Sequence, residues 1–246
     1  MVDTRGALRG GPSAAAAAPC RWTAAHGAAM RRIGLVLGAL LVLGDANLQA
    51  QALTLGTEAG VSVTQLASPG RHWDSHTGPL VGASLSASFT PWLAVQAGLR
   101  LHEKGAAGPW GYEIRILYLE FPLLVRVGVG SEDWRVRPLG TFGLAPATEL
   151  SCNEQVYVVP LSLDAASPAF TPTDCTDVRT DHFDLGVVAG GGVEVRLGGL
   201  RAAAVGQYTR GTHNIASGLG FSVYNRATSI VLSVSWPLWD RRPARR

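Results

Sequence analysis

The most constraining feature of this sequence is an alternation of apolar residues with small or polar ones. In residues 81–89, Val81, Ala83, Leu85, Ala87 and Phe89 occupy every second position, and Gly or Ser fills the positions between them. A period of two places the two sets on opposite faces of a β-strand. One face of this strand therefore suits an apolar environment, and the other suits a polar one.

The same alternation recurs along the chain, in eight stretches. We predict strands at residues 53–66, 79–90, 92–103, 113–128, 134–148, 182–197, 200–213 and 226–239. Connectors 67–78, 104–112, 149–181 and 214–225 are long, whereas 91, 129–133 and 198–199 are short. Long outer loops that alternate with short periplasmic turns are typical of bacterial outer-membrane barrels. The sequence thus predicts an all-β fold, an eight-stranded antiparallel up-and-down transmembrane β-barrel with both termini in the periplasm.

Aromatic residues support this topology, because Trp and Tyr gather at the two membrane interfaces. The predicted periplasmic rim receives Phe89, Trp92, Trp134, Trp236 and Trp239, and the outer rim receives Trp110, Tyr112, Phe183 and Tyr208. A soluble lipocalin-type barrel is the main alternative, but its apolar face would point inward around a ligand. Here the face opposite the apolar one carries Arg and Glu, which favours lipid outside and a polar interior.

The N-terminal part of the chain has the pattern of an export signal. Arg31 and Arg32 precede an apolar run at 33–43, and residues 50–52 supply small side chains for cleavage. The run is shorter than the roughly 20 apolar residues of a spanning helix, which is the alternative interpretation. We predict a signal peptide at 30–52, the barrel at 53–240 and a basic periplasmic tail at 241–246. Residues 1–29 are a disordered extension, or translation begins at Met30.

The charge of the chain gives no argument for a nucleic-acid partner. The formal net charge is +3, but residues 1–52 hold five of the 21 basic and two of the 18 acidic residues. Residues 53–246 therefore keep 16 of each sign and are formally neutral. The basic character belongs to the leader, so we predict that no nucleic acid is bound.

Two of the three cysteines, Cys152 and Cys175, lie in the predicted connector 149–181. In an exported chain this placement predicts a disulfide, with a metal pair or two free thiols as the alternatives. The connector is also rich in acidic residues, and long ordered loops on a rigid scaffold often carry function. It is either an interaction surface or a solvated loop that covers the barrel mouth.

Charged residues also fall on the predicted inward face. They are Glu58, Arg100, Glu120, Arg126, Arg137, Glu194, Arg196 and Arg201. The interior of an eight-stranded barrel is just wide enough for side chains to fill it, and an unpaired buried charge is unfavourable. We therefore predict an ion-pair network that plugs the lumen, in preference to a conducting channel. Pro122 predicts a bulge near Glu120, because proline cannot donate a ladder hydrogen bond.

Histidine and carboxylate side chains near the outer strand ends raise the possibility of hydrolysis. They are His72, Asp74, His76, His102, Asp181, His182, Asp184 and His213. No nucleophile motif accompanies them, and His72 with His76 lacks a third metal ligand at a defined spacing. We predict no catalytic residue, no cofactor and no metal.

One predicted strand carries a distinctive motif. Residues 118–126 read Tyr-Leu-Glu-Phe-Pro-Leu-Leu-Val-Arg. This segment resembles the "YLEIPLLLK" segment of the outer-membrane β-barrel domain family that includes the PorT-like proteins. The Gly-rich stretch 186–194 and the closing stretch 233–236 are similar to that family as well. The resemblance implies an eight-stranded outer-membrane barrel and, for the PorT-like branch, an association with protein secretion. The tail 240–246 departs from the family's aromatic end, so the assembly machinery would recognise 236–239 internally.

Taken from the sequence, the predicted function is that of an integral outer-membrane barrel without an open pore. It would be structural or would bind a partner through its extracellular loops. A porin-like transport or secretion-accessory role of the PorT-like kind is the first alternative, and a barrel hydrolase is the second. The predicted partners are outer-membrane lipid, the barrel assembly machinery during insertion, and an extracellular or periplasmic protein.

Overall fold

The computed structural model describes residues 50–69, 73–108, 113–130, 134–158, 169–174, 182–215 and 222–240. The chain divides into two compact units, 1–44 and 45–246, and all described residues belong to the second. Their strands are β1 (Ala52–Ala67), β2 (Asp74–Ser88), β3 (Leu93–Ala107), β4 (Glu113–Glu120), β5 (Leu123–Gly128), β6 (Val136–Val158), β7 (Ala169–Asp174), β8 (Phe183–Leu197), β9 (Leu200–Gly211) and β10 (Tyr224–Asp240). The described residues include no helix that is long and apolar enough to cross a membrane.

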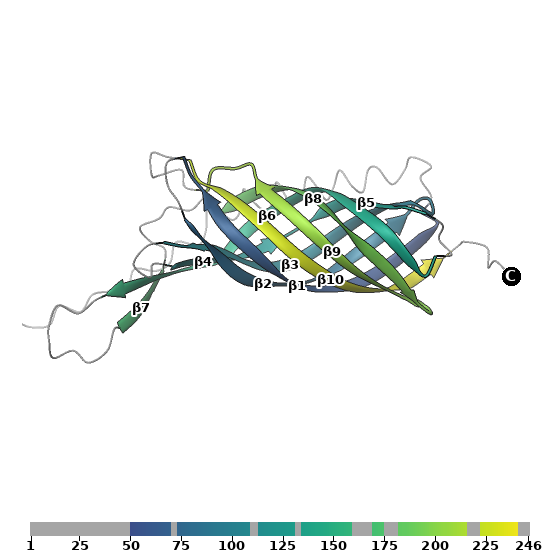
Figure 1. Ribbon diagram of the computed structural model, residues 1–246, viewed down its shortest axis with the longest axis horizontal. Helices are drawn as coiled ribbons and strands as arrows, with labels where there is room; N and C mark the ends of the chain where they lie inside the picture. The colour runs from purple at the N-terminus through teal and green to yellow at the C-terminus, as the bar shows by residue number, and fades with distance from the viewer. Residues whose placement is uncertain are drawn as a thin grey trace, which may run out of the picture. The chain divides into compact units, whose positions relative to one another are not determined.

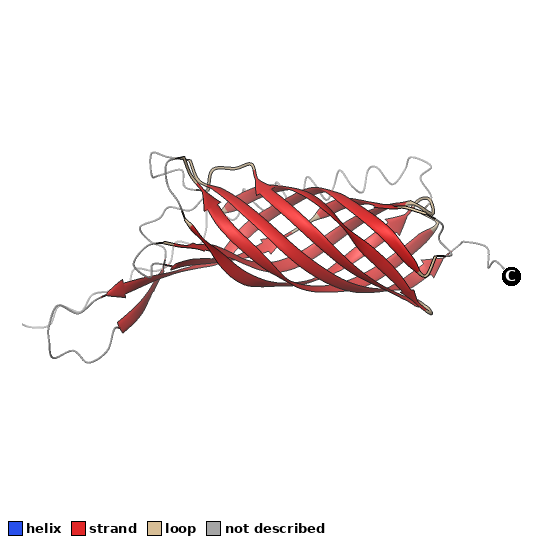
Figure 2. Cartoon of the chain, in the orientation of Figure 1, coloured by secondary structure: helices blue, strands red, loops and turns tan. Residues whose placement is uncertain are grey.

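The sheet closes into a ring, because β1 pairs with both β2 and β10. Every pairing around the ring is antiparallel, and the tilted strands enclose a barrel (Figures 1 and 2). Both β4 and β5 pair with β3 on one side and β6 on the other, so together they form one wall strand. The ring therefore has eight positions, and the predicted all-β antiparallel barrel is confirmed.

The wall strand formed by β4 and β5 is interrupted where the sequence predicted a bulge. β4 ends at Glu120 and β5 begins at Leu123. The Phe121 N–H donates to the Pro146 carbonyl at 2.8 Å, and the Pro122 carbonyl accepts from Gly98 N–H at 2.8 Å. A Cβ at Gly98 would lie 2.9 Å from Pro122 Cγ, so glycine leaves space for the ring. The predicted single strand 113–128 is thus two strands, because proline cannot donate to the ladder.

At one end the strands extend further than predicted. β3 continues to Ala107, and β6 continues to Val158, into the predicted connector 149–181. There β6 pairs with β7, from Asn153 opposite Asp174 to Val158 opposite Ala169. The two strands project beyond the ring as a hairpin (Figure 1). The segment predicted as one long connector is therefore built partly from paired strands.

Apolar side chains alternate outward and polar ones inward along the barrel wall. In β1, Val61 and Val63 are 56% and 46% exposed, whereas Ser62 between them is 1% exposed. The same outward face carries Val81, Leu85, Leu99, Leu101, Phe142, Leu144, Val187, Val193, Ile230, Leu232 and Val234. A band of exposed large apolar residues is the lipid-facing surface of a membrane barrel.

The interior is less uniformly polar than the sequence predicted. Small apolar clusters fill parts of it, such as Leu124 with Ala145 and Val188, and Leu139 with Ala203. Buried polar and charged side chains occupy the space between these clusters. The lumen is thus packed by side chains of both kinds.

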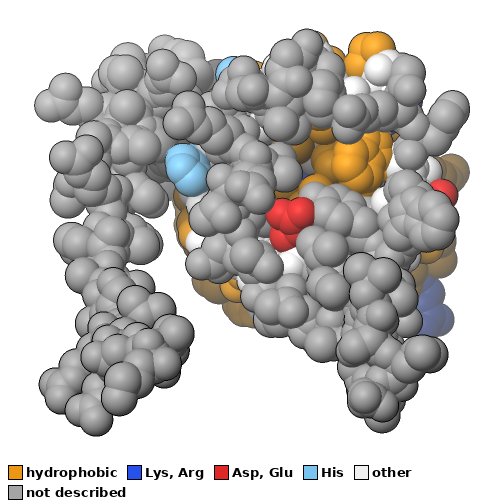
Figure 3. All heavy atoms as spheres, turned by 90° about the vertical axis from the view of Figure 1, so that its left-hand side faces the viewer, with side chains coloured by type: hydrophobic (Ala, Val, Ile, Leu, Met, Phe, Trp, Pro, Cys, Tyr) orange, Lys and Arg blue, Asp and Glu red, His pale blue; other side chains and the backbone are white. Residues whose placement is uncertain are grey.

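The two ends of the barrel differ in their connections. The short-turn end is where β2 is followed by β3, β5 by β6 and β8 by β9. Gly198 has a φ of +63°, a left-handed conformation that suits a two-residue hairpin. At the opposite, long-connector end lie the first residues of β2, β4, β8 and β10. Figure 3 looks onto that end, where acidic and histidine side chains are visible beside a hydrophobic patch.

Candidate functional site in the barrel lumen

One group of buried charges forms what we name the deep layer: Lys104, Glu120, His102 and Asp184. Lys104 Nζ lies 2.6 Å from Glu120 Oε1 and 3.8 Å from Asp184 Oδ2. The side chains of Lys104, Glu120 and Asp184 are 1–4% exposed. Asn225 Nδ2 donates to Asp184 Oδ2 at 2.8 Å, so β3, β4, β8 and β10 are tied together across the lumen.

His102 on β3 links Glu120 on β4 to Ser62 on β1. Its Nδ1 lies 3.1 Å from Glu120 Oε2, and its Nε2 lies 2.7 Å from Ser62 Oγ. Ser62, His102 and Glu120 thus bring together the residue types of a hydrolytic triad. All three side chains are buried in the lumen.

A second group of charges lies further along the lumen. Arg100 Nε donates to Glu58 Oε2 at 2.6 Å, and Gln96 Nε2 donates to Glu58 Oε1 at 2.5 Å. The Arg100 guanidinium also donates through Nη1 to Gln207 Oε1 at 3.0 Å. Gly82 stands opposite Arg100 on β2, where a Cβ would lie 2.8 Å from Arg100 Cγ. This glycine therefore makes room for the arginine that crosses the barrel.

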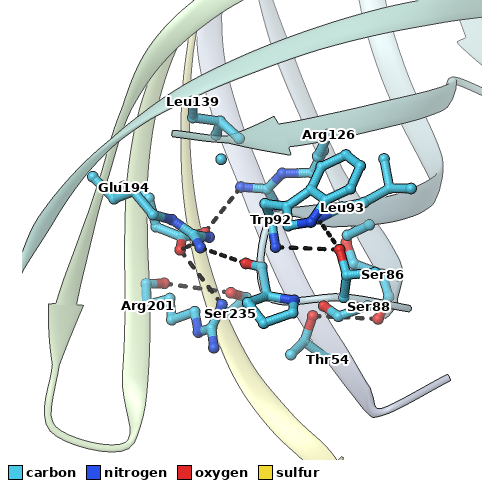
Figure 4. A pocket seen from close by; sticks show the side chains of 15 residues that line it. Thr54, Ser86, Ser88, Trp92, Leu93, Arg126, Leu139, Glu194, Arg201 and Ser235 are labelled. Carbon is cyan, nitrogen blue, oxygen red and sulfur yellow. Dashed lines mark hydrogen bonds and ion pairs between the residues drawn. The ribbon is translucent and has the colours of Figure 1, made fainter. Parts of the chain in front are cut away.

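At the short-turn end, three arginines surround one glutamate, a group that we name the short-turn cluster (Figure 4). Glu194 accepts from Arg126 Nη2 at 3.3 Å, from Arg137 Nη2 at 2.9 Å and from Arg201 Nη1 at 3.4 Å. Arg137 Nη1 also donates to the Pro91 carbonyl at 2.8 Å. These contacts join β5, β6, β8 and β9 to the turn between β2 and β3.

A small pocket lies beside the short-turn cluster. Its walls include Thr54, Ser86, Ser88, Trp92 and Ser235, together with the cluster (Figure 4). Its volume is about 30 Å³, which holds about two water molecules. The lumen at this point is therefore lined by hydroxyl and guanidinium groups but almost filled.

The structure brings together seven of the eight lumen residues that the sequence singled out. Glu58 meets Arg100, Glu120 meets Lys104 and His102, and Glu194 meets three arginines. Arg196 differs from the expectation: it is exposed beside the turn at 198–199, where the strand has left the barrel interior. The sequence missed Lys104, because the predicted strand ended one residue before it.

The histidines considered for hydrolysis or metal binding are scattered. His76 Nδ1 lies 2.8 Å from Glu113 Oε1 and its Nε2 lies 3.0 Å from Glu103 Oε1. His213 makes an edge-to-face contact with Phe183, at 6.1 Å between ring centroids. His72 and Asp181 lie outside the described residues, and Asp74 and His182 are exposed. Within the described ranges, no three His, Cys, Asp or Glu side chains are grouped so as to hold a metal ion.

Only some residues of the predicted aromatic girdles, and one of the two cysteines, lie among the described residues. Phe89, Trp92, Trp134, Trp236 and Trp239 lie at the short-turn end, and Phe183 and Tyr208 lie towards the other end. Trp110 and Tyr112 lie outside the described residues. Cys152 is half-buried in β6 opposite Ile116, whereas Cys175 lies outside the described residues. The disulfide stays a prediction.

The barrel is similar to solved outer-membrane proteins at low identity. Neisserial surface protein A has a TM-score of 0.43 at 11% identity, covering 74% of this chain and 96% of its own. OprG from Pseudomonas aeruginosa has a TM-score of 0.45 at 11% identity, with 77% and 97% covered. Ail of Yersinia pestis has a TM-score of 0.42 at 8% identity, with 76% and 99% covered. No curated protein matches the sequence.

The sequence also matches a protein family along most of its length. That family is described as the outer membrane protein beta-barrel domain, and the match covers residues 35–236. The match includes every position of the closed ring except the last residues of β10. A closed barrel with an apolar outward band around a polar interior is typical of outer-membrane proteins. This chain therefore belongs to the outer membrane protein beta-barrel domain family.

Proposed function

We propose that this protein is a closed barrel of the outer membrane that acts through its long-connector end and has no open pore. The observation that carries the proposal is the deep layer, in which Lys104 bridges two carboxylates across the lumen. An eight-stranded barrel leaves an interior that side chains can fill. Ion pairs between β3, β4 and β8 therefore take the place of a water column.

The size of the remaining space supports this proposal. Even beside the more exposed short-turn cluster, the pocket has a volume of about 30 Å³. A path for ions through the barrel would also have to pass Glu58 with Arg100 and then the deep layer. Each of these pairs would have to separate inside the lumen, which is strongly unfavourable.

Single-channel conductance in planar lipid bilayers tests the absence of a pore. We expect no conductance steps from the purified barrel. We also expect none from the Glu120→Gln, Glu194→Gln double variant, because glutamine keeps the side-chain volume. Heat-dependent migration in gel electrophoresis would verify that both proteins are folded. Stable steps from the folded unmodified barrel would contradict the proposal, and steps from the double variant alone would show that charge pairing, and not packing, closes the lumen.

We also propose that the long-connector end faces outward and that both termini are periplasmic. The support is the asymmetry of the connections, since outer-membrane barrels have their short turns on the periplasmic side. At the outward end, the hairpin of β6 and β7 projects as a candidate surface for an extracellular partner (Figure 1). The removal of residues 30–52 as a signal peptide belongs to the same proposal.

The hairpin register supports the proposed disulfide between Cys152 and Cys175. Asn153 stands opposite Asp174, and these residues are the chain neighbours of Cys152 and Cys175. Directly opposed positions of an antiparallel pair are close enough for a disulfide. Mass spectrometry of unreduced peptides tests it: we expect one peptide pair joined through these residues, and two free thiols would contradict the proposal.

A hydrolase is a second candidate, favoured by the 2.7 Å contact between Ser62 Oγ and His102 Nε2. Against it, Ser62 is 1% exposed and faces the packed lumen. Labelling with a fluorophosphonate probe separates the two functions. We expect no labelling of the folded barrel, and labelling that disappears in Ser62→Ala would establish a serine nucleophile.

A secretion-accessory role is the remaining candidate, favoured by the resemblance of residues 118–126 to the PorT-like proteins. It predicts a partner on the periplasmic side, whereas our first proposal places the partner on the hairpin. Cross-linking in intact cells with a photoreactive residue at Trp92 or at Asn153 distinguishes these roles. We expect cross-links from position 153. Cross-links from position 92 alone would favour the secretion role.

A further inference from the structure

A groove lies on the outer wall of the barrel, near the long-connector end. It runs over β8, β9 and β10 and has a volume of about 590 Å³. Its lining includes Val187, Ala189, Tyr208, Arg210, Tyr224 and Arg226. Val187, Ala189 and Tyr208 belong to the exposed outward face, so the groove opens towards lipid. We name it the rim groove.

Two arginines of the rim groove face one another directly. Arg226 on β10 and Arg210 on β9 are cross-strand partners, and both are exposed. Like charges in directly opposed positions of a sheet destabilise it. The other cross-strand neighbours are Gln65 beside Arg226 and Val187 beside Arg210, and neither is acidic. None of the ion pairs formed by the described residues includes either arginine.

Arg135 and Arg196 at the short-turn end are also exposed neighbours and take part in none of these ion pairs, but they do not line the rim groove. Arg115 is also exposed near the long-connector end, but it pairs with Glu113 at 3.0 Å. Inside the barrel, the short-turn cluster shares Glu194 among its arginines. The rim groove instead presents two guanidinium groups on an apolar and aromatic surface. An anion placed between them would remove their repulsion, and a phosphate matches the planar donors of arginine.

The position of the groove indicates where such an anion comes from. The lipid-facing band of the barrel contains Val187 and Tyr208 and ends near Arg210, so the guanidinium groups lie at the level of lipid head groups. Tyr208 and Tyr224 flank the arginines on the strands that carry them, as expected of interfacial aromatic residues. An acyl chain packed against Val187 and Ala189 would lie below a phosphate held by Arg210 and Arg226. The groove thus has a basic surface for the phosphate and an apolar surface for an acyl chain of one phosphorylated lipid.

We propose that the rim groove binds lipid A, with one of its phosphates bridging Arg210 and Arg226. This inference rests on the proposed orientation of the barrel, because lipid A forms the outer leaflet of the outer membrane. It goes beyond general solvation by lipid, since it assigns one head group to two residues. Basic pockets on the wall of membrane proteins bind phosphorylated head groups in the same way.

Native mass spectrometry of the detergent-purified barrel, titrated with bis-phosphorylated lipid A, tests the proposal. We expect one tightly bound lipid A, and at least tenfold weaker binding by the Arg210→Gln, Arg226→Gln variant. Arg115→Gln is the matched control and is expected to bind normally. The Arg210→Lys, Arg226→Lys variant keeps the charge and is expected to bind with intermediate affinity, because lysine lacks the bidentate donors.

Three other lipids test which lipid supplies the phosphate. A labelling experiment tests which side of the membrane the long-connector end faces. Lipid A without phosphates, phosphatidylglycerol and phosphatidylethanolamine are each expected to bind at least tenfold more weakly than bis-phosphorylated lipid A. Equal binding of phosphatidylglycerol, or unchanged lipid A binding by the glutamine variant, would overturn the proposal. A membrane-impermeant maleimide is expected to label Asn153→Cys, which lies on β6 outside the rim groove, in intact cells and in a background without the native cysteines. Labelling only after lysis would contradict the orientation, and with it the outer-leaflet lipid, whatever the lipid titration shows.

Discussion

The deep layer and the short-turn cluster use similar chemistry in different surroundings. In the deep layer, one lysine meets two carboxylates, and these side chains are 1–4% exposed. In the short-turn cluster, three arginines share one carboxylate, and the side chains are 10–20% exposed. The deep layer therefore keeps its charges away from solvent, whereas the cluster lines a pocket with space for about two water molecules.

The two groups thus differ in whether water can reach their charged side chains. A buried charge without a partner is far more unfavourable than one that water can reach. The deep layer must keep all its members, whereas the short-turn cluster can exchange one partner for solvent. Each prediction below tests whether the two groups differ in this way.

The largest effect is expected from Lys104→Met. The substitution leaves Glu120 and Asp184 without their shared cation in the sealed part of the lumen. We expect the free energy of unfolding to fall by about 3–5 kcal/mol. Urea unfolding in detergent micelles, followed by tryptophan fluorescence, measures it.

The control for this substitution is Arg115→Met, which removes an exposed partner of Glu113. We expect it to change the free energy of unfolding by less than about 1 kcal/mol. Equal effects of the two substitutions would show that the deep layer contributes no more than a surface ion pair.

A smaller effect is expected from Glu194→Gln. The three arginines lose their common carboxylate, but they lie beside the pocket and are partly exposed. We expect a loss of about 1–3 kcal/mol in the same unfolding experiment, and a smaller loss in high salt, because solvent anions screen the arginines. A loss as large as that of Lys104→Met would remove the distinction between the two groups.

The smallest effect is expected from Gly128→Ala. A Cβ there would lie 2.6 Å from Arg137 Cζ, so the guanidinium must move away from Glu194. We expect a loss of about 1 kcal/mol, as for mild overpacking. Gly140→Ala is the matched control, because its Cβ would meet nothing closer than the Val127 carbonyl at 3.8 Å. Equal unfolding free energies for the two variants would show that Arg137 does not depend on this space.

Much of the fold could be predicted from the sequence because a barrel wall is periodic. The alternation in residues 81–89 reports which side chains face lipid, and it is confirmed by the exposure of Val81 and Leu85. The split at Pro122 was predictable as a bulge for the same local reason, the missing N–H. The hairpin of β6 and β7 was not predicted, since the short strand 169–174 contains Pro172 and offers little alternation.

The lumen partners were harder to predict, because they depend on distances between strands far apart in the chain. Lys104 continues the inward period of Arg100 and His102, but the predicted strand ended at residue 103. Asp184 and His102 were considered only as hydrolase residues, although both take part in the deep layer. The sequence shows that a side chain points inward, but not at which height in the barrel it meets a partner.

The central claim is that the deep layer seals the lumen while the short-turn pocket stays accessible. The most direct test is the reaction of single cysteines with methyl methanethiosulfonate, a thiol reagent smaller than a maleimide, in a background without the native cysteines. Ser62→Cys lies at the deep layer and Ser235→Cys lies in the pocket wall. We predict that the cysteine at 235 reacts in the folded barrel and that the one at 62 reacts only after unfolding. Equal reaction at both positions in the folded barrel would contradict the claim.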